Sequence, residues 1–206
     1  MKDEEYEATS KAKRQAESGN PEGAIETLRE FLETEPNNTK ARMQLARTLI
    51  YDMDKVDEGI LQLENVLKLE PENTDAMKAM VTVLARHKKN NKRTCEIYEK
   101  LLTISPDAEL FNSYAIFLRI QKTDFKRSAE YYEKAIALKP REPVYRRNYA
   151  VLLLNDLKDY EKAKNELEML IKLDPGDVSA KKNYDLLMEK KFDSDGKLKK
   201  KTLFRR

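Results

Sequence analysis

Five stretches of the chain follow one pattern, an amphipathic helix closed by a proline, and the most regular is Ser128–Pro140, SAEYYEKAIALKP. The five closing prolines are Pro36, Pro71, Pro106, Pro140 and Pro175. They follow one another at intervals of 35, 35, 34 and 35 residues. Self-similarity at a fixed period of this length is typical of stacked helical repeats, in which each unit packs only on its neighbours. The sequence therefore predicts one elongated array of short helices.

Apolar residues recur at three- and four-residue steps, which predicts two helices in each repeat. The expected helices are 4–17, 21–34, 40–51, 56–69, 76–87, 92–103, 108–120, 125–139, 144–154 and 160–173, and then a capping helix at 178–190. The corresponding repeats are about 5–37, 38–72, 73–107, 108–141 and 142–176, followed by the cap at 177–190. No segment is a strong strand candidate. The expected fold of residues 1–190 is an all-α, right-handed superhelical solenoid.

Composition agrees with helices that bury one face, since 37% of the residues are charged and 40% are hydrophobic. No apolar run approaches the roughly 20 residues needed to span a bilayer. The first residues, MKDEEYEATSKAK, lack the apolar core of a secretory signal. The one cysteine, Cys95, cannot form an intramolecular disulfide and fits a reducing compartment. The expected location is therefore the cytoplasm.

The small residues at fixed places in each repeat carry a resemblance to a known family. A large residue followed by a small one marks the first helices as Leu45-Ala46, Met80-Val81, Tyr114-Ala115 and Tyr149-Ala150. A small residue opens the second helices as Ala24, Gly59, Thr94, Ser128 and Ala163. Small residues let two helix backbones approach closely where they cross. In these features, and in its closing prolines, the chain resembles the tetratricopeptide repeat family over about residues 5–190.

Two departures from that family pattern are visible in the repeats. The spacing from Ala46 to Gly59 is 13 residues, as it is from Ala150 to Ala163, where a 34-residue period would give 12. The turn between the two helices is therefore expected to hold one extra residue. The later small position of the second helix is kept only at Ala135.

Residues that could support catalysis are scarce, so we expect no enzyme, no cofactor and no metal. The single histidine, His87, is expected at a helix C-terminus, where a cation is favourable. Cys95 has no Cys or His near enough in the sequence to share a metal, and there is no glycine-rich phosphate loop. The stretch Asp193–Gly196 resembles the start of a calcium loop, but lysines replace the later ligands. It is expected to be a polar turn.

The resemblance implies that the first helices line a groove that holds a segment of a partner protein. The residues that it places in this groove are Lys13, Lys40, Met43, Arg47, Lys78, Thr82, Asn112, Ile116, Arg119, Arg147, Asn148, Val151, Lys182 and Asn183. Most of their charges are basic, which favours an acidic or amphipathic peptide because arginine binds carboxylates well. The alternative is that these side chains are merely solvated. The residues do not reproduce the carboxylate clamp of the members that bind the Hsp70 and Hsp90 C-termini, so that partner is not supported.

The positive net charge of +3 is concentrated at the C-terminus. Residues 190–206 hold eight Lys or Arg and two Asp, a balance of +6, so the remaining 32 basic and 35 acidic residues balance at −3. The segment 191–206 is expected to be a disordered basic tail. Its end, Lys197–Arg206, can be read as a solvated tail, as a contact for nucleic acid or an acidic membrane surface, or as a segment that docks on a partner or on the groove.

The function expected from these observations is a non-catalytic adaptor or scaffold that binds a partner peptide in a basic groove. Binding of a polyanion through the tail is the alternative from another class. A third possibility is a regulatory subunit of an enzyme encoded elsewhere, which the lack of catalytic candidates permits.

Overall fold

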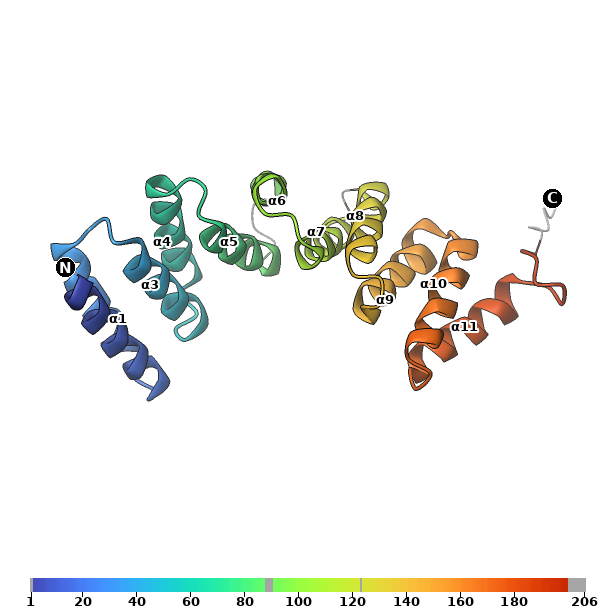
Figure 1. Cartoon of the computed structure of the whole chain (residues 1–206), viewed down its shortest axis with the longest axis horizontal. Helices are drawn as coiled ribbons and strands as arrows, with labels where there is room; N and C mark the ends of the chain where they lie inside the picture. The colour runs from blue at the N-terminus through green and yellow to red at the C-terminus, as the bar shows by residue number, and fades with distance from the viewer. Residues whose placement is uncertain (1, 88–90, 123, 200–206) are drawn as a thin grey trace, which may run out of the picture. The chain divides into compact units, whose positions relative to one another are not determined.

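The computed structural model describes residues 2–87, 91–122 and 124–199, and α-helices dominate this part of the chain (Figure 1). The chain divides into two compact units, Met1–Ser105 and Pro106–Arg206. We refer to them as unit 1 and unit 2, and describe each by itself.

Unit 1 contains three antiparallel helix pairs. Their bounds are α1 (Lys2–Glu17) and α2 (Pro21–Thr34), α3 (Thr39–Tyr51) and α4 (Val56–Leu69), and α5 (Thr74–Arg86) and α6 (Asn91–Ile104). Each helix packs on its partner, α2 also packs on α3, and α4 on α5. The first helices α1 and α3 also contact each other directly.

Unit 2 continues the alternation and adds the capping helix. Its elements are α7 (Ala108–Ile120), α8 (Phe125–Leu138), α9 (Pro143–Leu152), a π-helical turn η1 (Leu153–Leu157), α10 (Tyr160–Leu173) and α11 (Val178–Lys191). The expected all-α repeat fold is therefore confirmed, and the division into five repeats stays a prediction. The helix expected at 144–154 is α-helical only to Leu152, since the next turn widens into η1.

Short polar residues begin most of these helices, which explains why the chain turns where it does. The side chain of Asn38, the N-cap of α3, accepts a hydrogen bond from the backbone N–H of Ala41 at 2.9 Å. The other N-caps whose side chains accept such a bond include Asn20, Asn73, Asp107, Asp124, Asp159 and Asp177. Each satisfies one of the backbone donors that a helix N-terminus leaves open.

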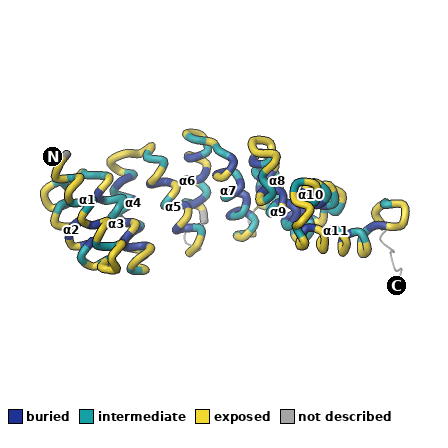
Figure 2. The backbone as a smooth tube through the Cα atoms, turned by 60° about the horizontal axis from the view of Figure 1, so that its bottom comes forward, coloured by how far each residue is buried: buried dark blue, intermediate teal, exposed yellow. Residues whose placement is uncertain are grey.

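The small residues lie where helices cross, as the sequence predicts. Ala24, Ala46 and Ala115 are fully buried, and Figure 2 shows the buried side of the helices in dark blue. Ser128 is also fully buried, and its hydroxyl donates to the carbonyl of Ala115 at 2.8 Å. A Cβ atom at Gly59 would lie 2.3 Å from Cγ1 of Ile50. These positions tolerate only small side chains because the backbones approach closely.

The extra residue in the turns between paired helices adopts a left-handed conformation. Asp54, Lys122 and Lys158 have φ values of 52°, 54° and 57°. In two of these turns a backbone hydrogen bond closes seven residues, from Lys55 N–H to the Leu49 carbonyl at 2.7 Å and from Asp159 N–H to the Leu153 carbonyl at 3.1 Å. Many helices end on a residue in the left-handed conformation, and glycine is the usual residue there.

Replacing Lys158 by glycine is expected to raise the free energy of unfolding of unit 2 by about 0.5–1 kcal/mol, because a residue with a Cβ atom is strained at this φ. Urea titration followed by circular dichroism measures the change. The matched control is Lys172→Gly, within α10, which should lose about 1 kcal/mol. Equal destabilisation by both changes would contradict the turn geometry.

The segment after α11 departs from the expected disordered tail. Phe192 is 3% exposed, pairs with Leu198 in an isolated antiparallel bridge and packs in the core that includes Leu167 and Leu187. The Asp193 carboxylate accepts backbone N–H bonds from Asp195 at 3.0 Å and Lys197 at 2.9 Å, as expected for a polar turn. The segment folds back because Phe192 covers the apolar end of the unit. Residues 200–206 of the expected tail lie outside the described residues.

Candidate functional site

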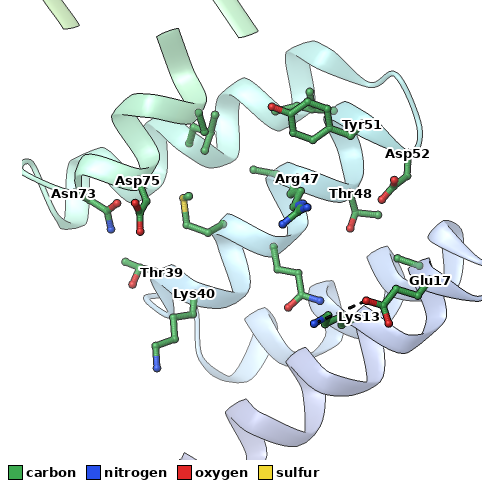
Figure 3. A pocket seen from close by; sticks show the side chains of 17 residues that line it. Lys13, Glu17, Thr39, Lys40, Arg47, Thr48, Tyr51, Asp52, Asn73 and Asp75 are labelled. Atoms are coloured by element: carbon green, nitrogen blue, oxygen red, sulfur yellow. Dashed lines mark ion pairs between the residues drawn. The ribbon is translucent and has the colours of Figure 1, made fainter. Parts of the chain in front are cut away.

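The first helices of unit 1 enclose a hollow of about 1120 Å³. Its walls come from residues within 13–17 of α1, 39–52 of α3 and its C-cap, and 73–79 at the start of α5 (Figure 3). Leu63 of α4 also lines it. We call it the unit 1 hollow. Four of the residues expected in the groove line it together, namely Lys13, Lys40, Met43 and Arg47.

The unit 1 hollow has an apolar base and one exposed aromatic ring. Ala46, Ile50 and Leu63 are buried, and Met43 is half-buried beside them. Tyr51, at the end of α3, is 53% exposed although it is among the bulkiest side chains of the unit. An amphipathic ring of this kind supplies a large contact area at little conformational cost. Tyr51 was not among the expected groove residues, although it lies four residues after Arg47 and so on the same side of α3.

The basic residues of the unit 1 hollow are partly neutralised by acids of the same chain. Lys40 Nζ lies 2.8 Å from Glu5 Oε1, and this hydrogen bond and charge raise the pKa of Lys40. Lys13 forms a looser pair with Glu17 at 3.8 Å. Among the described residues, Arg47 has neither an ion pair nor a side-chain hydrogen bond. The same holds for the carboxylates of Asp52 and Asp75.

The groove residues expected in unit 2 are largely engaged with one another or with acids. Asn148 Nδ2 donates to Oδ1 of the buried Asn112 at 3.0 Å. Arg119 pairs with Asp156 of η1 at 2.6 Å, and Arg147 pairs with Asp177 at 2.7 Å. The bonds from Arg147 and from the backbone of Ala180 lower the pKa of Asp177.

The other expected groove residues lie outside the unit 1 hollow. Lys78 and Thr82 are exposed on α5 but do not line the unit 1 hollow, and the Thr82 hydroxyl donates to the Lys78 carbonyl at 2.8 Å. Ile116 and Val151 are half-buried, and Lys182 and Asn183 are exposed on α11. Of the expected groove residues, only those of α1 and α3 therefore line the unit 1 hollow.

Acids one repeat away from the predicted cations were missed, although the sequence holds a signal for them. Lys40 and Glu5 are 35 residues apart, and Arg119 and Asp156 are 37 apart. A second set joins neighbouring second helices at a constant spacing of 29. Its pairs are Arg29–Glu58 at 2.8 Å, Glu64–Arg93 at 2.6 Å and Glu133–Lys162 at 3.2 Å. A search for opposite charges near the repeat period would have found both sets.

A smaller hollow of about 300 Å³ on unit 2 includes Glu133, Tyr149 and Lys162. The Tyr149 hydroxyl donates to Glu133 at 2.5 Å, and burial together with this bond raises the pKa of Tyr149. The same hydrogen bond, with Lys162, lowers the pKa of Glu133. The carboxylate is therefore held ionised as an acceptor, and the tyrosine is held protonated as its donor.

The remaining candidates lie as the sequence suggested. His87 is the C-cap of α5, and its backbone N–H donates to the Val83 carbonyl. Cys95 is half-buried beside Thr94, which occupies the helix crossing. Within the described residues, no three His, Cys, Asp or Glu side chains are placed to hold a metal ion. None of the described helices is both long and apolar enough to cross a membrane.

Comparison with known proteins identifies the class of fold. A family model described as tetratricopeptide repeat matches residues 118–178. A structure titled MamA 41-end from Desulfovibrio magneticus RS-1 has a TM-score of 0.74 at 20% identity, covering 85% of this chain and 98% of its own. A tetratricopeptide repeat protein from Parabacteroides merdae ATCC 43184 has a TM-score of 0.76 at 16% identity, covering 91% and 73%.

A third structure, titled YrrB, a TPR protein with an unusual peptide-binding site, has a TM-score of 0.65 at 17% identity, covering 80% of this chain and 84% of its own. No curated protein matches the sequence significantly. The resemblance drawn from the sequence is therefore confirmed at the level of the fold: the chain has the tetratricopeptide repeat fold.

Proposed function

We propose that the chain is a non-catalytic adaptor that binds an extended or amphipathic segment of a partner protein in the unit 1 hollow. The observation that carries this proposal is the hollow itself, which combines an apolar base, the exposed ring of Tyr51 and the unpaired guanidinium of Arg47. Pockets that bind ligands have this mixture of apolar walls and a few polar groups. A YrrB structure of similar fold is named for its peptide-binding site, which supports a peptide as the class of ligand.

The stacked helices make this mode of binding favourable. The walls of the hollow belong to α1, α3 and α5, whose backbones are already fixed by packing on their paired helices. The array therefore presents its side chains with little ordering cost on its own side, and most of the entropic cost falls on the partner segment. Arg47 would bind a carboxylate of that segment, so the partner segment is expected to contain an acidic residue.

The test is a selection of binding peptides from a random phage-displayed library against the full chain, followed by titration of the selected peptides. Tyr51→Ala is expected to weaken their binding about tenfold, because exposed aromatic rings in a pocket are common hot spots. The matched control is Tyr6→Ala, since Tyr6 is 72% exposed on α1 but does not line the hollow. Equal effects of the two changes would contradict the proposed site.

A second candidate function is polyanion binding through residues 197–206. Its support is local, because Lys197 and Lys199 flank Leu198, which is 40% exposed. Basic side chains around an exposed apolar one suit an acidic membrane surface. Since Phe192 is buried, the informative truncation removes only residues 200–206. Loss of vesicle or nucleic-acid binding with peptide binding kept would establish a separate activity of the tail.

The regulatory-subunit alternative, the absence of a chaperone clamp and the cytoplasmic location stay predictions from the sequence. The adaptor proposal does not depend on any of them.

A further inference from the structure

The charges left without an intramolecular partner in the unit 1 hollow are mixed in sign. Arg47 provides one positive charge, while Asp52 and Asp75 provide two negative ones. All three side chains belong to exposed residues. In Figure 3, Arg47 lies between Asp75 on one side and Asp52 on the other. The cations that made the groove look basic, Lys13 and Lys40, are already paired with Glu17 and Glu5.

Asp52 is placed where its charge gives the fold no benefit. It is the C-cap of α3, and its backbone N–H donates to the Thr48 carbonyl. The C-terminus of a helix carries partial negative charge, so a carboxylate there is disfavoured and a cation is favoured. A positively charged group of a ligand beside Asp52 would interact favourably with both the carboxylate and the helix end.

Asp75 lies at the opposite end of the hollow. It is in the first turn of α5 and follows Lys40 by 35 residues, so it corresponds to the start of a first helix. The N-terminus of α5 stabilises this carboxylate, which explains its presence without a ligand. Asp75 nevertheless lines the hollow, and no cation among the described residues pairs with it. Its charge would therefore repel an acidic group of a ligand at this end.

The helical rise gives the separation of the three charges along the direction of α3. Arg47 and Asp52 are five residues apart along α3, which corresponds to about 7.5 Å at the helical rise. Asp75 occupies in α5 the position that Lys40 occupies in α3. Lys40 is seven residues before Arg47, which corresponds to about 10 Å along the helix direction. An extended peptide advances about 3.3 Å per residue, so two or three residues bridge each interval.

We infer that the unit 1 hollow selects a partner segment with one carboxylate flanked on both sides by Lys or Arg, rather than a uniformly acidic segment. This inference rests on the proposed function and names the chemistry of its ligand. The carboxylate meets Arg47, the two cations meet Asp52 and Asp75, and apolar side chains between them pack on Met43 and Tyr51. Complementary charges of this kind set the partner and its register more than the total affinity.

Three fluorescent peptides of about seven residues test the charge pattern, with leucine and serine in the spacer positions. The matched peptide has a central glutamate and a lysine at each end, the acidic peptide has glutamate at all three places, and the inverted peptide has a central lysine between two glutamates. Fluorescence anisotropy with the full chain is expected to show the matched peptide binding about tenfold more tightly than the acidic one, since each exposed charge contact changes Kd a few-fold.

The double variant Asp52→Lys/Asp75→Lys is expected to reverse this preference in favour of the acidic peptide. Its control is Glu33→Lys/Glu72→Lys, which makes the same change in net charge at exposed residues outside the hollow. The control should keep the wild-type preference, and circular dichroism checks that both variants are folded.

The results separate the inference from the function on which it rests. A wild type that prefers the acidic or the inverted peptide, or binds none of the three while still binding phage-selected peptides through Tyr51, overturns the inference and leaves the proposed function intact. Reversal of preference by the control variant also overturns it. If neither designed nor selected peptides depend on Tyr51, the proposed function fails as well.

Discussion

Replacing Ala150 by arginine is expected to lower the free energy of unfolding of unit 2 by about 2–4 kcal/mol. Ala150 is 2% exposed on α9 and belongs to the core that includes Ala163 and Leu167 of α10. The larger side chain has no room between the two helices. Its positive charge would be buried away from water with no opposite charge to pair with. Urea denaturation of the wild type and the variant measures the loss.

Ala137→Arg is the matched control for this change. Ala137 is an exposed residue in α8 of the same unit, so its replacement should change stability by no more than about 0.5 kcal/mol. A chain of two units can unfold in more than one step. The wild type and Ala150→Arg are therefore compared at a transition whose midpoint Ala137→Arg leaves unchanged. An unchanged transition in Ala150→Arg would show that the assigned helix faces are wrong.

Gly59→Val is expected to destabilise unit 1 by about 2–3 kcal/mol through overpacking. An added Cβ would lie 2.3 Å from Cγ1 of Ile50 and 3.1 Å from the backbone oxygen of Ala46. Ile50 is buried, so it cannot swing out into water, and the backbone of α3 cannot yield without moving the whole helix. Thermal and urea unfolding both report the loss.

Two further variants separate overpacking from a general effect of losing glycine. Gly176→Ala, in an exposed turn where the nearest atom would be 3.3 Å from the new Cβ, should be nearly neutral. Adding Ile50→Ala to Gly59→Val should recover part of the lost stability, because it removes the side chain that clashes. Additive losses in the double variant would contradict the close crossing of α3 and α4.

The helices were predictable because period, caps and prolines agree. The bounds expected for α2, α4, α7 and α10 are those observed. α2 begins at a proline, and α7 and α10 begin after an aspartate that caps them, whereas α4 begins after Lys55 with no side-chain cap and was placed by its apolar pattern alone. The widening of α9 into η1 was not predictable, because an apolar stretch such as Leu152–Leu154 fits an α-turn and a π-turn equally well. Phe192 carried a weak signal, as an isolated aromatic residue six positions before Leu198 with Gly196 between them.

Four of the fourteen residues expected in the groove line the unit 1 hollow, but the charge of this surface was not predictable. The place of Met43 and Arg47 in the repeat brought them to the face that lines the unit 1 hollow. Whether a groove cation is free depends on acidic residues of the neighbouring repeat. Lys40 pairs with Glu5 and Arg147 pairs with Asp177, and the pattern within a single repeat does not reveal these pairs. The expectation of a basic groove therefore rested on side chains whose charges are largely compensated within the chain.

The proposed peptide site can be tested directly by NMR of the full chain with isotope-labelled methionine methyl groups. The sequence holds seven methionines, of which Met43 lines the unit 1 hollow and Met169 is 38% exposed on unit 2. Addition of a phage-selected peptide is expected to shift the Met43 resonance and leave that of Met169 in place. A peptide that binds the wild type while Met43 stays unmoved, or that shifts only Met169, would contradict binding in the hollow.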